Sequence, residues 1–186
     1  MIKMSSFKTA SAVLVLLASI SAFAAPPNNS AVSNVAITAT LPETLTVSLD
    51  QSAVNFSLVA GSATNAGNVP IVATTSWALA AGRASVNLYA YFDVAAAALS
   101  GPTDIAGTTI TAKVGGTSAG NFATDLSALG FTGTGLPLPV FHQALTAGTL
   151  VGTQSSSVAL NIDLTSLPAL PVGIYTGTLH FRAQVI

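Results

Sequence analysis

The sequence contains one match to a catalytic motif, Gly116-Thr117-Ser118-Ala119-Gly120, which has the G-x-S-x-G spacing of a nucleophile elbow. That motif works where a strained turn between a strand and a helix exposes the serine hydroxyl. Here the five residues stand between segments with strand-like alternation, in a chain rich in Gly, Ser and Thr. A plain loop is therefore the better interpretation, and a serine hydrolase is the least favoured function.

Other residue types with catalytic or metal-binding chemistry are few and scattered. His142 and His180 are the only histidines, and neither has a histidine or carboxylate at metal-ligand spacing. The single glutamate and the dispersed aspartates form no evident pair for glycosidic chemistry. The chain has no cysteine, and so neither a thiolate nor a disulfide. We expect no enzymatic activity, no catalytic residue, no cofactor and no metal.

The N-terminus has the features of an export signal. Lys3 and Lys8 precede or flank the apolar run Ala10–Ile20, and Ala22-Phe23-Ala24 has the small-x-small pattern before a signal-peptidase cut. The run is shorter than the roughly 20 residues that a membrane-spanning helix needs. We predict a signal peptide over residues 1–24 and a mature chain that is secreted, periplasmic or on the cell surface, with no membrane attachment after cleavage.

Charge is unusually scarce in the predicted mature chain, where three basic side chains stand against six acidic ones. A basic patch cannot be built from so few cations, so nucleic acid is excluded as a partner. Weak charge also removes a main barrier to self-association. A hydrophobic content of 51% is ample for a packed interior.

Apolar and polar residues alternate through most of the mature chain, which is typical of half-buried strands. The clearest runs are 45–50, 54–58, 86–93, 109–114, 158–164 and 175–185, with two further candidates at 69–79 and 136–145. Pro137 and Pro139 favour an edge position for the last of these. Single helical turns are expected at Val94–Leu99 and Thr124–Leu129.

These runs, separated by short turn signals, predict the fold class. We expect an all-β, immunoglobulin-like, two-sheet antiparallel sandwich of about 7–9 strands. A single domain covers residues 25–186, with 25–33 as a flexible leader. The inward members of the alternations are the predicted core: Val47, Phe56, Leu88, Leu160, Leu179 and Phe181.

Aromatic side chains supply candidates for ligand binding. Trp77 is interpreted as a core anchor between the sheets. Tyr89 and Tyr91 alternate with Leu88 and Phe92, so they point to the opposite, outward face of their strand. Such a pair can stack on a carbohydrate or a protein partner, or simply pack against neighbouring strands. The sequence leaves both open.

The two ends of the mature chain carry a family resemblance. Ser33–Pro42 is an alternating segment, and Pro171-Val172-Gly173-Ile174-Tyr175 forms a P-x-G-x-Y turn before the last alternating run. This layout resembles chaperone–usher pilus subunits, in particular their spore-coat-U-like branch. The chain differs from that group in lacking cysteine and in having Val185 where an aromatic residue is usual.

The resemblance implies an incomplete sandwich that is completed by a strand donated from another subunit. Val35, Ile37, Ala39 and Leu41 would then be the strand-addition residues. Gly173, Leu179, Phe181 and Ala183 would be the contacts of the C-terminal strand. The implied function is a structural subunit of a surface fibre, pilus or coat, with copies of itself or a periplasmic chaperone as partners. The alternative is a monomeric binding module for carbohydrate or protein, in which Ser33–Pro42 folds back as the first strand of its own sandwich.

Overall fold

The computed structural model describes residues 30–123 and 137–186. By its internal contacts the chain divides into Met1–Ala39 and a compact unit, Thr40–Ile186. Residues 30–43 form no helix or strand, so the strand predicted over Ser33–Pro42 is absent from the single chain. An isolated strand has no neighbour to receive its backbone hydrogen bonds, which makes it unstable in water. The predicted signal peptide lies outside the described residues.

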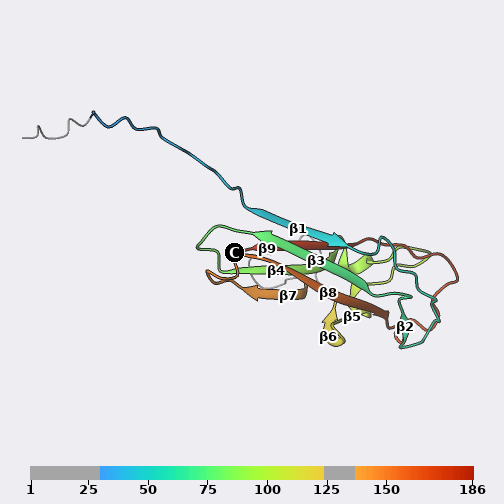
Figure 1. The fold of residues 1–186 in the computed structure, drawn as a ribbon. Helices are drawn as coiled ribbons and strands as arrows, with labels where there is room; N and C mark the ends of the chain where they lie inside the picture. Colours follow the sequence, from blue (N-terminus) through green and yellow to red (C-terminus); the bar gives the residue numbers. More distant parts are fainter. Residues whose placement is uncertain (1–29, 124–136) are drawn as a thin grey trace, which may run out of the picture. The chain divides into compact units, whose positions relative to one another are not determined.

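The compact unit is a sandwich of two antiparallel sheets, as predicted (Figure 1). The larger sheet has the strand order β1-β3-β8-β5-β6, and β2 pairs with the end of β8. Its strands are β1 (Thr44–Leu49), β2 (Asn65–Ala66), β3 (Ile71–Ala78), β5 (Ile110–Val114), β6 (Thr117–Asn121) and β8 (Val151–Ile162). The smaller sheet has the order β7-β4-β9, formed by β7 (Leu138–Ala144), β4 (Ser85–Phe92) and β9 (Leu179–Val185).

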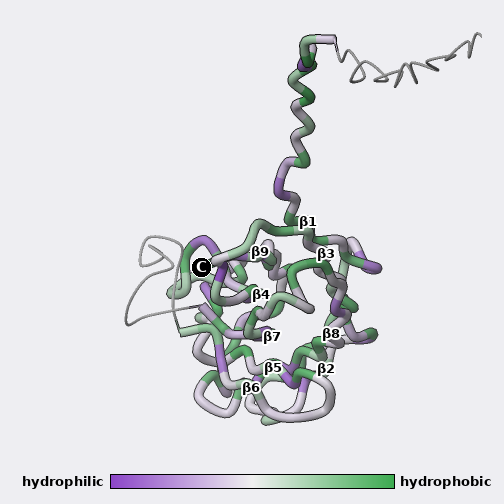
Figure 2. Tube along the Cα trace, turned by 60° about the vertical axis from the view of Figure 1, so that its left-hand side comes forward, coloured by the Kyte–Doolittle hydropathy of each residue, from purple (hydrophilic) through white to green (hydrophobic). Residues whose placement is uncertain are grey.

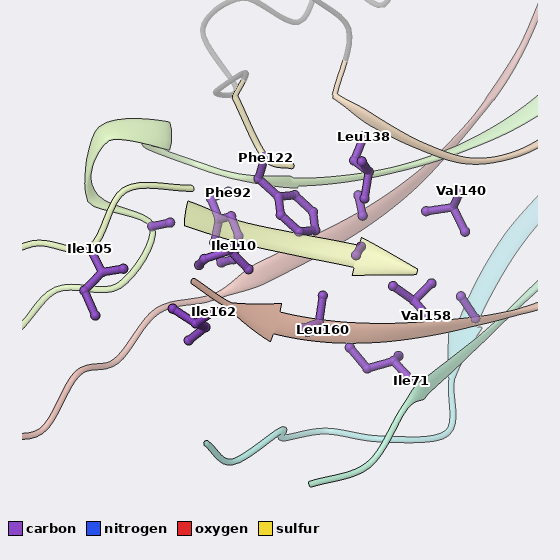
Figure 3. Close-up of a cluster of buried hydrophobic side chains, with 14 of the residues drawn as sticks. Ile71, Phe92, Ile105, Ile110, Phe122, Leu138, Val140, Val158, Leu160 and Ile162 are labelled. Atoms are coloured by element: carbon purple, nitrogen blue, oxygen red, sulfur yellow. The ribbon is translucent and has the colours of Figure 1, made fainter. Parts of the chain in front are cut away.

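The period-2 alternation places one face of each sheet in the core. Figure 2 shows the smaller sheet facing β3 and β8 across the interior. Side chains from both sheets meet there in one layer, with the rings of Phe92 and Phe122 edge to face at 5.1 Å (Figure 3). Trp77 is buried, as predicted, and its indole N–H donates to the carbonyl of Thr149 at 2.9 Å. Each such fully buried large apolar side chain stabilises the fold by roughly 1.5–3 kcal/mol.

Several local predictions are confirmed and others are wrong. β7 is an edge strand, as its prolines indicated, and a short 3₁₀ helix, η1 (Ala95–Ala97), falls within Val94–Leu99. A second 3₁₀ helix, η2 (Gly107–Thr109), precedes β5. The turn predicted at Thr124–Leu129 lies outside the described residues. The segment 54–58 is not a regular strand, because only one bridge, Phe56 to Gly67, joins it to a neighbour.

Candidate functional site

The compact unit contains a groove of about 850 Å³, lined by the end of β1 at Leu49, by two irregular segments, 51–60 and 170–178, and by the start of β9. We call this feature the groove. Its floor is formed by core side chains: Ile71, Phe92, Ile110, Leu160 and Ile162. No Asp, Glu, Lys, Arg or His side chain is among the described residues that line it. The groove therefore suits an uncharged occupant.

The position of the groove corresponds to a specific strand of the immunoglobulin fold. In that fold the strands A-B-E-D form one sheet and C-F-G the other. Here β1-β3-β8-β5 follows the first order, and β4 with β9 corresponds to C and F. Among the described residues, no strand occupies the G position beside β9. The groove therefore lies where the seventh strand of a complete sandwich would add.

Among the described residues, β9 has a strand neighbour, β4, on one edge only. Ile186 and Ser85 exchange both backbone hydrogen bonds, at 3.0 and 3.3 Å. Because paired and unpaired positions alternate along an antiparallel strand, the amides and carbonyls of Phe181 and Ala183 point away from β4. A free strand edge of this kind is a template for another strand.

The side chains of β9 that face the core are only partly buried. Leu179, Phe181 and Ala183 all pack against the buried cluster, but each is only partly buried. Phe56, another predicted core residue, is also partly buried and lines the groove. By contrast Leu88 and Leu160, which lie on interior strands, are buried as predicted, and Val47 on β1 is half-buried. The partial burial is concentrated where a strand could still be added.

One wall of the groove is the extended segment around Asn55, whose backbone forms hydrogen bonds with Asn68. The amide of Asn55 donates to Oδ1 of Asn68, and the amide of Asn68 donates to the carbonyl of Asn55, both at 2.9 Å. Since successive residues of an extended chain direct their backbone groups to opposite sides, those of Phe56 face away from Asn68. The side chains of Val54 and Leu58 line the groove together with Phe56.

The other wall is residues 170–178, which we call the strap. Its backbone pairs with the loop after η1, because Ser100 and Thr176 exchange two hydrogen bonds at 2.8 and 2.9 Å. The hydroxyl of Tyr175 donates to the carbonyl of Pro171 at 2.6 Å and closes the turn. Gly173 is in the turn because space is lacking: a Cβ there would lie 2.4 Å from Cγ of Pro102. The sequence singled out Gly173, and its role is this close approach.

The predicted strand-addition residues lie in the N-terminal segment and are fully accessible. Val35, Ile37 and Leu41 are 85%, 90% and 90% exposed, and Ala39 is also exposed. We call residues 33–42 the arm. Large aliphatic side chains at this exposure are costly unless something covers them, since apolar surface is favoured in a dry environment.

The tyrosine pair is not an exposed face. Tyr89 and Tyr91 lie on the outward side of β4, as the alternation predicted, but only 7% and 8% of their surfaces are exposed. The ring of Tyr91 stacks on that of His180 at a centroid distance of 5.3 Å. Of the two interpretations that the sequence left open, the burial of both rings agrees with packing against neighbouring strands and not with an accessible stacking platform.

The residues with potential chemistry are not brought together. Ser118 lies in β6 opposite Lys113 in a β-hairpin, not on the strand-to-helix turn that a nucleophile elbow requires. His142 pairs with the side-chain oxygen of Asn87 at 2.6 Å, and His180 lies 3.2 Å from Asp93. Within the described part of the chain, no three His, Cys, Asp or Glu side chains are placed to hold a metal ion.

The walls of the groove include residues that the sequence did not single out, notably Leu99 and Leu170. Neither belongs to an alternating run, so periodicity gave no signal for them. None of the described residues forms a helix long and apolar enough to cross a membrane. Comparison with protein-family models, curated proteins and solved structures finds no match for the chain.

Proposed function

We propose that this protein is a non-enzymatic structural subunit of a bacterial surface fibre, pilus or coat, which assembles by β-strand addition. The observation that carries the proposal is the uncharged groove beside β9, with partly buried core side chains and an unpaired strand edge. A strand added there would satisfy backbone groups and cover apolar surface at once, which is the basis of β-augmentation.

The arm has the composition that such a groove would bind. Val35, Ile37, Ala39 and Leu41 stand at alternate positions, so in an extended conformation they share one face. Burial of the three large side chains would contribute about 5–9 kcal/mol in total. The loss of translational and rotational freedom on association offsets part of this gain. The proposed occupant of the groove is the arm of a second copy.

The positions of the two ends of β1 support assembly into an open-ended polymer of subunits. Thr44, where β1 begins, pairs with Ala78 at the end of β3, beside the β3–β4 connection. Leu49, at the other end of β1, lines the groove. β1 therefore begins, at Thr44, at the end of the strand away from the groove. A contact between two different surfaces of one chain is heterologous and extends into filaments unless a rotation closes it.

Low charge favours the same assembly. The predicted mature chain carries six acidic and three basic residues, so stacked copies repel one another weakly. Localisation outside the cytoplasm and removal of residues 1–24 belong to this proposal. Secreted material that begins at Ala25 by mass spectrometry would agree with it, and retention of Met1–Ala24 would contradict it.

The experiment compares two variants, each of which introduces one negative charge at one of two neighbouring positions in the arm. Ile37→Asp places a carboxylate on the apolar face of the arm, and Thr38→Asp places the same charge on the opposite face. We expect the mature chain and Thr38→Asp to form a ladder of oligomers in native electrophoresis, and Ile37→Asp to remain monomeric. A stable monomer for the unmodified mature chain at all concentrations would overturn the proposal, and so would equal ladders for the two variants.

A further inference from the structure

A charged cluster holds the chain at the point where the arm joins the sandwich. Oε1 of Glu43 accepts hydrogen bonds from the amide of Ala80 at 2.7 Å and from Nε of Arg83 at 3.1 Å. Oε2 of the same carboxylate pairs with an Arg83 Nη at 2.5 Å. The guanidinium thus binds the carboxylate with two parallel bonds, the geometry that gives Arg–carboxylate pairs their strength and direction.

This cluster stands out in a chain that is only 6% charged. Glu43 is the only glutamate in the sequence. In the part of the chain that the structure describes, the other close contact between a basic and an acidic side chain joins His180, on β9, and Asp93, which follows β4. The hydrogen bonds from Arg83 and then from Ala80 lower the pKa of Glu43 from 4.5 to about 2, so the carboxylate stays ionised to a lower pH than an ordinary glutamate.

The strand next to Glu43 is weakly held by its own packing. β1 begins at Thr44 and is an edge strand, with β3 as its hydrogen-bonded neighbour. Its inward residues Leu45 and Val47 are only half-buried, and its other four residues are exposed. Few buried apolar contacts and an exposed edge are the properties of segments that open locally.

We propose that Glu43 and Arg83 form a latch that fixes the junction of the arm and β1 to the β3–β4 connection. This inference rests on the proposed function, in which a neighbouring subunit holds the arm. Tension on the arm would reach the chain at residues 40–43. Without the latch, that tension would strip the β1–β3 hydrogen bonds one after another from the Thr44 end. With the latch, the load passes through Glu43 into residues 80–83, and the β1–β3 ladder stays intact.

Hydrogen exchange of the full mature chain tests the latch without any assembly. Glu43→Gln keeps the shape of the side chain and removes its charge. Asp163→Asn is the matched control, because Asp163 also accepts bonds from a backbone amide and a side chain, both of Thr165, far from β1. We expect the amides of Ala80 and Thr46 to exchange several-fold faster in Glu43→Gln and at the unmodified rate in Asp163→Asn.

Force spectroscopy tests the mechanical role directly. The chain has no cysteine, so Ser33→Cys in the arm and Ser157→Cys in β8 supply unique attachment points in the otherwise native protein. We expect β1 to detach from β3 at a lower force in Glu43→Gln and in Arg83→Lys, which lacks the guanidinium fork. Circular dichroism verifies that both variants remain folded.

The outcomes separate the latch from the proposed function. Equal detachment forces and equal β1 exchange in the unmodified chain and Glu43→Gln would overturn the latch, whatever the state of assembly. If Ile37→Asp and the unmodified chain assemble equally while β1 exchange still responds to Glu43→Gln, the latch stands and strand addition fails.

Discussion

Ala90 and Phe181 face each other across β4 and β9 on the interior side of the smaller sheet, yet Ala90 is fully buried and Phe181 is only partly buried. The two residues belong to the same row of the same sheet, so their side chains point into the same layer. The difference arises because β4 has a neighbouring strand on each side, whereas β9 has the groove on one side. A sandwich with a further strand beside β9 would bury both Ala90 and Phe181.

This asymmetry predicts unequal costs for removing two phenylalanines. Phe92→Ala, at a site only 4% exposed, should lower the free energy of unfolding by about 3–5 kcal/mol. Phe181→Ala should cost less, about 1–2 kcal/mol in a monomeric chain, because part of the ring is already in water. Denaturant unfolding followed by the fluorescence of Trp77, the only tryptophan, measures both. Equal costs would mean that Phe181 is a full member of the core and that no strand is missing beside it.

Much of this fold could be predicted from the sequence because strand alternation depends on local pattern. The runs containing Leu88 and Leu160 identified central strands and their inward faces correctly. The hairpin strand β6 was missed, since Thr117–Asn121 contains the three small residues Ser118, Ala119 and Gly120 and shows no apolar period. The segment 54–58 has the period of a strand but lacks a continuous neighbour, which is a tertiary property that alternation does not report.

The strap should be sensitive to a single methyl group. In Gly173→Ala the new Cβ would lie 2.4 Å from the Pro102 ring, which cannot move aside easily, so we expect a loss of about 1–3 kcal/mol in unfolding free energy. Gly148→Ala is the control, since nothing lies within 4 Å of a Cβ there, and it should change stability by less than about 0.5 kcal/mol. Thermal unfolding of the two variants compares them. Indistinguishable midpoints would show that the strap does not pack on Pro102.

The buried hydroxyl of Thr75 should lower the free energy of unfolding. Thr75 is fully buried, and its Oγ1 has no hydrogen-bond partner among the described residues. Thr75→Val removes the unsatisfied group, so we expect a gain of about 1 kcal/mol in unfolding free energy. Thr153→Val is the comparison, because that hydroxyl bonds Ser76 Oγ at 2.6 Å, and it should not stabilise. Urea unfolding distinguishes the two, and a loss of stability in Thr75→Val would show that its hydroxyl is satisfied.

Acid should weaken the fold partly through Glu43. Its pKa is lowered from 4.5 to about 2 in the folded state, by the hydrogen bonds from Arg83 and Ala80. A group with a depressed folded pKa contributes stability that is fully present above its unfolded pKa and is lost as the pH falls through the folded value. We therefore expect the melting temperature to fall between about pH 4.5 and 2, and to fall less in Glu43→Gln. Parallel curves for the two proteins would contradict the role of this carboxylate.

Only part of the candidate site could be predicted from the sequence. Phe181, Ala183 and Gly173 were identified through the pattern of the C-terminal segment. The structure places Phe181 and Gly173 in the lining of the groove and packs Ala183 against the core. An incomplete sandwich was implied only by the resemblance at the chain ends. Strand periodicity could not predict the groove, because it is formed by segments distant in the sequence and, among the described residues, by the lack of a strand beside β9. For the tyrosines of β4, alternation gave the outward face of the strand but could not decide between an exposed pair and a covered one, because it does not show what lies over a side chain.

The central claim is that an arm segment adds as a strand beside β9. Its most direct test is hydrogen exchange of the Ile37→Asp mature chain with and without a synthetic peptide of residues 33–42. The account predicts that the peptide slows exchange of the Phe181 and Ala183 amides, which point away from β4, while a peptide carrying Ile37→Asp does not. Unchanged exchange at these two amides at saturating peptide, or protection that appears only at the β6 or β7 edges, would contradict it.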